Sequence, residues 1–120
     1  MFKVLTTDDL KANGSRTATF EGEAHSAGTS FFLVDNDPGQ GPGLHRHPYS
    51  ETWVVLAGEA VITADGEDIP AKEGDVVVVD AETPHKFRNT GTDRLLIMCI
   101  HASPRFIQEW LPEPVDVAST

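Results

Sequence analysis

Short apolar runs, rich in β-branched and aromatic residues, alternate with turn residues along most of the chain. Glycine-containing turn signals separate these runs, and the Asp65-Gly66 pair is typical of a tight hairpin. Many short strands at such spacing are typical of an all-β sandwich or barrel. The pattern predicts strands at residues 16–20, 29–34, 51–57, 59–64, 67–70, 75–79, 86–89 and 95–101.

After residue 102 the sequence pattern is that of a helix instead of a strand. Ser103 and Pro104 are typical of a helix cap followed by the first helical residue, and Pro112 would end that helix. Apolar side chains between these prolines recur at helical spacing. We therefore predict a short C-terminal helix at about residues 104–111, packed either on the outside of the barrel or at a subunit interface. Its apolar side chains are those of Phe106, Ile107, Trp110 and Leu111.

Length and charge narrow the class of protein. The 120 residues suit a single domain over the whole chain, with a barrel core at about residues 15–102. The formal net charge is −10 and no segment concentrates Lys or Arg, which argues against nucleic acid and acidic membrane surfaces as partners. Because the N-terminus lacks the apolar core of a signal peptide and no run approaches the ~20 apolar residues of a membrane span, we expect a cytoplasmic protein.

Candidate metal ligands cluster in the middle of the chain. His45 and His47 are one residue apart, and Glu51 keeps the same parity. Side chains at alternate positions of a strand share one face, so the two imidazoles and the carboxylate are expected to converge. Such a set suits a divalent first-row metal ion. His85, on a later β-like run, is available as a fourth ligand.

The spacing of these residues resembles the two sequence motifs of the cupin family. The first family motif is Gly, five residues, His-X-His, three or four residues, Glu, six residues and Gly. The second motif is matched by its glycine, histidine and asparagine, while Asp80 and Glu82 stand where the family usually has Pro and Gly. These departures affect the turn before the histidine and leave the ligands unchanged. The matching residues are Gly39, His45, His47, Glu51 and Gly58 for the first motif, and Gly74, His85 and Asn89 for the second.

The resemblance has consequences for fold, cofactor and assembly. It implies a double-stranded β-helix, the jelly-roll barrel of cupins, with one divalent transition metal ion per chain. The ligands would be His45, His47, Glu51 and His85, a set that suits Fe, Mn, Ni, Cu or Zn without choosing among them. Small cupins commonly pair, so we expect a homodimer, formed through the N-terminal strands or the predicted C-terminal helix.

Strand parity also predicts what lines the pocket. Tyr49 and Trp53 share the face of His47, and Phe87 shares the face of His85, so all three are candidate substrate-binding residues. Trp53 and Phe87 are alternatively ordinary core residues, and the Tyr49 hydroxyl can point to solvent or to the pocket.

One further histidine is a candidate for proton transfer. His101 ends the last strand and is either a pocket acid–base residue or a surface histidine. By parity Lys86 and Arg88 point away from the metal, so no cationic anchor for an anionic substrate is expected. A small, largely apolar organic substrate fits this pocket best.

Three classes of function are compatible with these features. The first is a metal-dependent enzyme of the dioxygenase type, the second a redox-neutral isomerase, lyase or sugar-modifying enzyme, and the third a non-catalytic binding module. The complete ligand set favours an enzyme, with Glu51 and His101 as catalytic residues. We favour the dioxygenase because no charged acid–base pair is visible besides the ligands.

Overall fold

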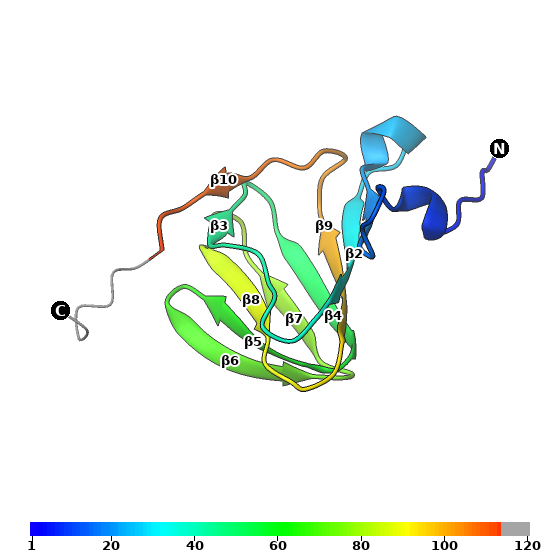
Figure 1. Cartoon of the computed structure of the whole chain (residues 1–120). Helices are drawn as coiled ribbons and strands as arrows, with labels where there is room; N and C mark the ends of the chain where they lie inside the picture. Colours follow the sequence, from blue (N-terminus) through cyan, green and yellow to red (C-terminus); the bar gives the residue numbers. More distant parts are fainter. Residues whose placement is uncertain (114–120) are drawn as a thin grey trace.

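The computed structural model describes residues 1–113 and is built almost entirely of strands (Figure 1). Two short 3₁₀ turns lie near the N-terminus, η1 (Asp8–Leu10) and η2 (Gly22–His25). The ten strands are β1 (Ala18–Phe20), β2 (Ser30–Asn36), β3 (His45–Arg46), β4 (Glu51–Ala57), β5 (Glu59–Ala64), β6 (Glu67–Lys72), β7 (Val76–Val79), β8 (His85–Asn89), β9 (Leu95–His101) and β10 (Glu109–Trp110).

The strands form two antiparallel five-stranded sheets. Sheet A has the order β1-β2-β9-β4-β7, and sheet B has the order β10-β3-β8-β5-β6. The predicted all-β class is confirmed, and each of the eight predicted strands is present with small shifts at its ends. Within residues 1–113 no strand pair joins the two sheets, so ladder hydrogen bonds do not close a complete barrel.

Alternating side chains from both sheets fill the space between them. In β4 and β9 every second residue is buried, which places one face of each strand in the core and leaves the other outside. The core residues include Trp53, Val55, Ile62, Phe87, Leu95 and Ile97. The motif glycine Gly58 forms the turn between β4 and β5 with φ +88°, where an added Cβ would lie 2.5 Å from the Arg94 carbonyl oxygen. Only glycine fits that turn.

The predicted C-terminal helix is wrong. Pro104 and Arg105 lie in a bend, and the segment that follows runs without helical structure across the ends of both sheets (Figure 1). Within it, β10 pairs with β3 through Glu109 opposite Arg46 and Trp110 opposite His45. The Leu111 amide donates to the Leu44 carbonyl oxygen at 2.9 Å. These long-range bonds outweigh helical propensity, since an isolated helix of two turns has little stability of its own.

No helix among the described residues has the length and apolar character needed to cross a membrane.

Candidate metal centre

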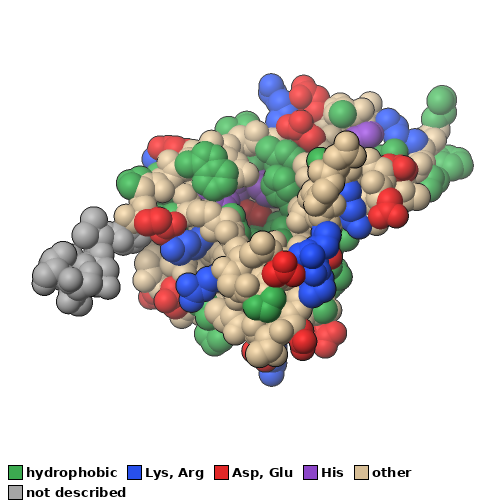
Figure 2. Space-filling model, viewed as in Figure 1, with side chains coloured by type: hydrophobic (Ala, Val, Ile, Leu, Met, Phe, Trp, Pro, Cys, Tyr) green, Lys and Arg blue, Asp and Glu red, His purple; other side chains and the backbone are tan. Residues whose placement is uncertain are grey.

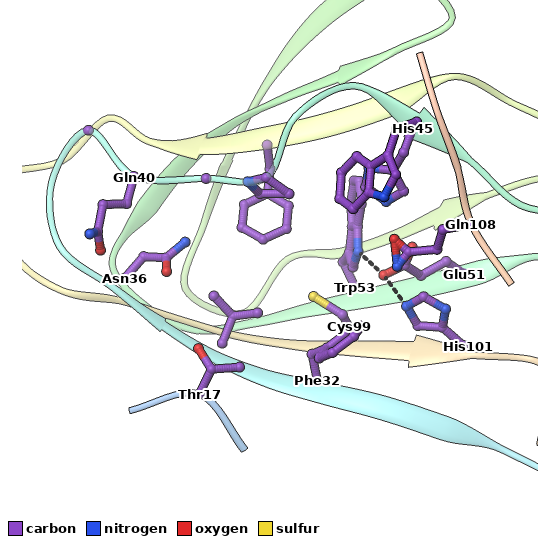
Figure 3. Close-up of a pocket in the computed structure, with 16 residues that line it drawn as sticks. Thr17, Phe32, Asn36, Gln40, His45, Glu51, Trp53, Cys99, His101 and Gln108 are labelled. Carbon is purple, nitrogen blue, oxygen red and sulfur yellow. Dashed lines mark hydrogen bonds and ion pairs between the residues drawn. The ribbon is translucent and has the colours of Figure 1, made fainter. Parts of the chain in front are cut away.

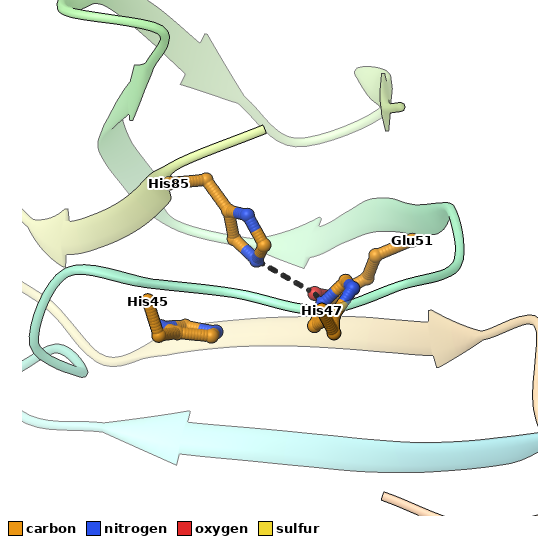
Figure 4. A group of neighbouring side chains, drawn as sticks. All are labelled: His45, His47, Glu51 and His85. Carbon is orange, nitrogen blue, oxygen red and sulfur yellow. Dashed lines mark hydrogen bonds and ion pairs between the residues drawn. The ribbon is translucent and has the colours of Figure 1, made fainter. Parts of the chain in front are cut away.

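The two sheets bring the four predicted ligands to one point. His45 opens β3 and His85 opens β8, where they are paired directly across sheet B, and Glu51 opens β4 in sheet A. His47 follows β3. One ligand atom from each residue lies within 4.8 Å of the others, and all four side chains are buried (Figure 4). The predicted convergence of the four residues is confirmed.

A backbone carbonyl fixes the orientation of each imidazole. In all three rings Nδ1 contacts a carbonyl oxygen, which can only accept, so Nδ1 carries the proton. The Nε2 atom of each neutral ring therefore presents a lone pair toward the centre, as in metal-binding histidines. The carbonyl partners are Gly43 for His45 (2.8 Å), Tyr49 for His47 (2.8 Å) and Thr83 for His85 (2.7 Å).

The Glu51 carboxylate is held so that one oxygen faces the imidazoles. Its Oε2 atom accepts a hydrogen bond from Trp53 Nε1 at 2.6 Å and lies 3.2 Å from His101 Nε2, within ion-pair distance. Its Oε1 atom lies 2.8 Å from His47 Nε2 and 3.1 Å from His85 Nε2. Three imidazole nitrogens and a carboxylate oxygen that converge in this way form a donor set that fits a divalent metal ion.

The protonation states suit metal binding. Burial raises the pKa of the Glu51 carboxyl, but hydrogen bonds and imidazole contacts from His101, His47 and His85 outweigh burial and hold that pKa well below its usual range. Burial lowers the pKa of His45. Glu51 is therefore ionised and His45 neutral near pH 7, the forms that bind a metal. Burial raises the pKa of the neighbouring Cys99 thiol well above its usual value, so no thiolate joins the set.

Metal affinity should be level near neutral pH and fall in acid. The ordinary histidine pKa is 6.5, and burial lowers the pKa of His45 below it. Protons therefore compete with the metal ion for this ring only below pH 6.5. Titrating the protein with a divalent metal ion from about pH 8 to about pH 5 measures the change. An affinity that stays constant between about pH 7 and pH 5 would contradict imidazole ligation.

The turn before His85 keeps its conformation although Glu82 stands where the second motif usually has glycine. Glu82, at the position usually held by glycine, adopts φ 65°, the left-handed conformation that glycine favours. Its backbone amide donates to the His47 carbonyl oxygen at 2.8 Å, which links the two ligand-bearing segments. The left-handed turn is therefore retained without glycine, at a cost on the order of 1 kcal/mol.

A chain of polar contacts connects Glu51 to the C-terminal segment. His101 is buried, with its Nε2 atom 3.2 Å from Glu51 Oε2 and its Nδ1 atom hydrogen-bonded to the Tyr49 hydroxyl at 2.7 Å. The Tyr49 oxygen in turn accepts from the Ile107 amide at 3.2 Å. His101 thus lies inside the site, and the Tyr49 hydroxyl points toward His101.

A cavity of about 540 Å³ opens beside the ligands (Figure 3). Figure 2 shows histidine and carboxylate atoms at the bottom of a hollow flanked by hydrophobic side chains. Trp53 and Phe87 line the cavity together with His45, Glu51 and His101, whereas Tyr49 is not among its lining residues. The described lining includes no Lys or Arg. The remaining lining residues are Thr17, Phe32, Val34, Asn36, Gly39, Gln40, Gly41, Pro42, Cys99, Gln108 and Trp110.

The C-terminal segment supplies cavity residues that the sequence analysis missed. Gln108 and Trp110 reach the cavity, and the Trp110 and His45 ring centres are 5.1 Å apart. Phe106 stacks on Phe32 at 4.3 Å. The sequence carries no signal for them, because the apolar residues 106, 107, 110 and 111 have helical rather than alternating spacing. The Gln108 Oε1 atom is buried and has no hydrogen-bond partner among the described residues.

Comparisons with known proteins agree with the fold. Among curated relatives, the oxalate-binding protein of Thermotoga maritima is 34% identical over 77 residues, which span 63% of this chain and 64% of that protein. A Klebsiella pneumoniae protein with a double-stranded β-helix domain superposes with a TM-score of 0.71 at 21% identity over 90% of both chains.

A larger enzyme contains a similar fold. The oxalate decarboxylase of Lactobacillus farciminis, solved as a formate complex, superposes with a TM-score of 0.74 at 23% identity. The match covers 87% of this chain and 34% of that enzyme. The family model of the cupin domain matches residues 32–101, more than half of the chain. With its two-sheet fold and both cupin motifs, the chain belongs to the cupin family.

Proposed function

We propose that this chain is a metal-dependent enzyme that acts on a small organic molecule bound in the cavity. The observation that carries the proposal is the convergence of three imidazole nitrogens and a Glu51 oxygen at one point, with His45 and Glu51 lining that cavity. Four protein ligands leave one or two positions open on a five- or six-coordinate ion, which is the arrangement of catalytic rather than structural sites. The molecule would bind at these positions through its own oxygen atoms.

The charges in the site favour a ligand with at most one negative charge. Three neutral imidazoles and one carboxylate around a divalent ion leave one net positive charge. A singly ionised enol or phenol would neutralise that charge, and Trp53 and Phe87 offer aromatic surface to its apolar part. A dianion would leave a buried negative charge, and no Lys or Arg among the described lining residues would balance it.

His101 is proposed as the residue that moves a proton. Its Nε2 atom lies 3.2 Å from Glu51 Oε2, and the residue lines the cavity in which a molecule would bind. The Tyr49 hydroxyl can donate to Nδ1 or accept from it, so it supports both the neutral and the protonated ring. Burial raises the pKa of Tyr49, so Tyr49 keeps its own proton and orients His101.

The metal ion would supply Lewis-acid polarisation of a ligand oxygen and, in the case of Fe, Mn or Cu, one-electron chemistry. We propose the dioxygenase class first because the cavity offers no charged acid–base pair besides the ligands and His101. Oxygen uptake by the Fe- or Mn-loaded protein with catechol and with a cyclic 1,3-diketone tests this class. Turnover of these compounds by the Zn-loaded protein without oxygen would instead support a redox-neutral enzyme.

A second candidate function is binding of a small carboxylate without turnover. It is favoured by the relative named an oxalate-binding protein, which is 34% identical over 77 residues. Calorimetric titration of the metal-loaded protein separates the candidates. Our proposal predicts tighter binding of catechol than of oxalate, whereas tight oxalate binding with no conversion of any compound would support the second candidate.

Replacing Gln108 with alanine should weaken binding of a hydroxylated ligand. The buried Oε1 atom is free to accept a hydrogen bond, and an unmatched buried acceptor is costly, so a ligand hydroxyl is its expected partner. We expect about a tenfold higher Kd for catechol in Gln108→Ala, with metal content unchanged. Thr17→Val, at the cavity end distant from the ligands in Figure 3, is the control. An unchanged Kd in Gln108→Ala would remove this residue from the ligand contacts.

A further inference from the structure

The cavity beside the metal centre extends well beyond the ligands. In β2, Phe32 and Asn36 share the inward face of the strand, and both line the cavity. Ser30, on the same face, is paired with His101, whose ring lies beside Glu51. At about 3.3 Å per residue, the far end of this face lies roughly 20 Å along the strand from the level of His101. One aromatic ring bound at the ligands would therefore fill only part of the cavity.

The lining of the cavity changes from apolar to polar along this length. The aromatic side chains of Phe32 and Trp53 lie toward the ligands, whereas Figure 3 shows Thr17, Asn36 and Gln40 at the opposite end. We call these last three residues the distal group. Outside the metal centre, the described lining contains no Asp, Glu, Lys or Arg, so the far end of the cavity is polar without being charged.

The distal group has hydrogen-bonding capacity that the protein itself does not use. The Gln40 Oε1 atom accepts from the Asp37 amide at 2.8 Å, which leaves the Gln40 Nε2 atom to donate. The Thr17 hydroxyl oxygen accepts from the Asp35 amide at 3.4 Å, so the hydroxyl proton is left for a ligand. Within residues 1–113 the Asn36 side chain has no hydrogen-bond partner, and its amide can both donate and accept.

The backbone that carries Gln40 is fixed in place without a ligand. The Gly39 amide donates to the Asn89 carbonyl oxygen at 2.8 Å, and the Asn89 amide donates to the Gln40 carbonyl oxygen at 2.8 Å. Gly41 packs so closely on β8 that an added Cβ would lie 1.9 Å from the Phe87 carbonyl oxygen. This wall is therefore formed in advance, which reduces the entropy lost when a molecule binds to it.

We propose that the distal group is a second binding subsite for an uncharged, carbonyl-bearing group, such as an amide, at the far end of the molecule that binds the metal. Gln40 and Thr17 donate to its carbonyl oxygen, and the Asn36 amide accepts from its N–H. A carboxylate is disfavoured there, because no Lys or Arg among the described lining residues would balance it. This inference rests on the proposed function and specifies its substrate class, an elongated molecule with an oxygen-bearing head, an apolar middle and an uncharged polar end.

Calorimetric titration of the zinc-loaded protein with two matched series of catechols tests the subsite. In one series a chain of two to five methylene groups joins the ring to an acetamido group, and in the other the chain ends in an isobutyl group of the same shape without polar atoms. The quantity compared is the ratio of the two dissociation constants at each chain length. At the best length, Asn36→Leu should reduce the preference for the acetamido compound by about fivefold or more, the effect of one or two hydrogen bonds. The Kd of unsubstituted catechol should not change.

Thr19→Val, on an exposed position of β1 outside the cavity, is the control and should keep the wild-type preference. Circular dichroism and metal content show whether each variant is folded. If Asn36→Leu does not fold, Gln40→Met preserves the test, because Gln40 is exposed. An equal preference in the wild type and the folded variants at every chain length, with catechol bound, would overturn the subsite alone. Failure of catechol itself to bind would overturn the proposed function and the subsite with it.

Discussion

The His45→Ala/His47→Ala variant is expected to lose its metal, with affinity for a divalent ion falling by more than about 100-fold. Loss of a residue that merely orients a ligand costs 10- to 100-fold in affinity, and this variant removes two ligands outright. The Nδ1 atoms of both rings are held by backbone carbonyls, so their Nε2 atoms face the centre. Without these two rings, only His85 and Glu51 remain as protein ligands. Titration of untagged protein in competition with a chromophoric chelator measures the affinity.

The matched control is His25→Ala, because His25 lies in η2 and stacks on Phe20 outside the centre. It should bind metal as the wild type does. Denaturant unfolding of the metal-free proteins shows whether the double variant remains folded. Full metal occupancy in a folded His45→Ala/His47→Ala variant would show that the metal binds elsewhere.

Glu51→Gln is expected to reduce turnover by several hundred-fold, a far larger effect than its effect on the stability of the metal-free protein. The amide keeps the shape of the side chain and can still accept from Trp53 Nε1, but it removes the negative charge that faces the ion. Metal affinity should fall by about 100-fold. Even at a saturating metal concentration, the polarisation of a bound molecule by the ion should change, because the negative charge of Glu51 is missing. Because its contacts hold the pKa of Glu51 below the usual range, the ionised carboxylate stabilises the fold, and the neutral amide should lower the stability of the metal-free protein modestly.

Glu59→Gln is the matched control for this change, because Glu59 is exposed on β5 and outside the cavity. Turnover of any compound found active is compared at saturating metal, together with the midpoint of denaturant unfolding. Equal turnover in the Glu51→Gln variant and the wild type would exclude Glu51 from the reaction. It would favour a binding role for the centre.

The metal centre was predictable because its geometry follows from local rules. His45 and His47 share a face at spacing two, and the motif spacing supplied His85, so four ligands could be named without coordinates. The tautomers were not predictable. They depend on the carbonyls of Gly43, Tyr49 and Thr83, which tertiary structure places.

The C-terminal segment shows where local patterns mislead. Capping residues and an apolar stripe favoured a helix, and no alternation of apolar and polar residues indicated a strand. The deciding contacts are long-range, such as β10 pairing with β3 and the Ile107 amide bonding to Tyr49. Tertiary contacts of this kind override weak local propensity. The missed cavity residues Gln108 and Trp110 follow from that single error.

X-ray absorption spectroscopy of metal-loaded protein, purified without a histidine tag, tests the central claim most directly. It reports the number and kind of atoms bound to the ion. The account predicts one ion per chain with three imidazole nitrogens and a carboxylate oxygen, at about 2.0–2.2 Å for a zinc-loaded sample. A sulfur ligand from Cys99, which also lines the cavity, or a spectrum with fewer than two imidazoles would contradict it.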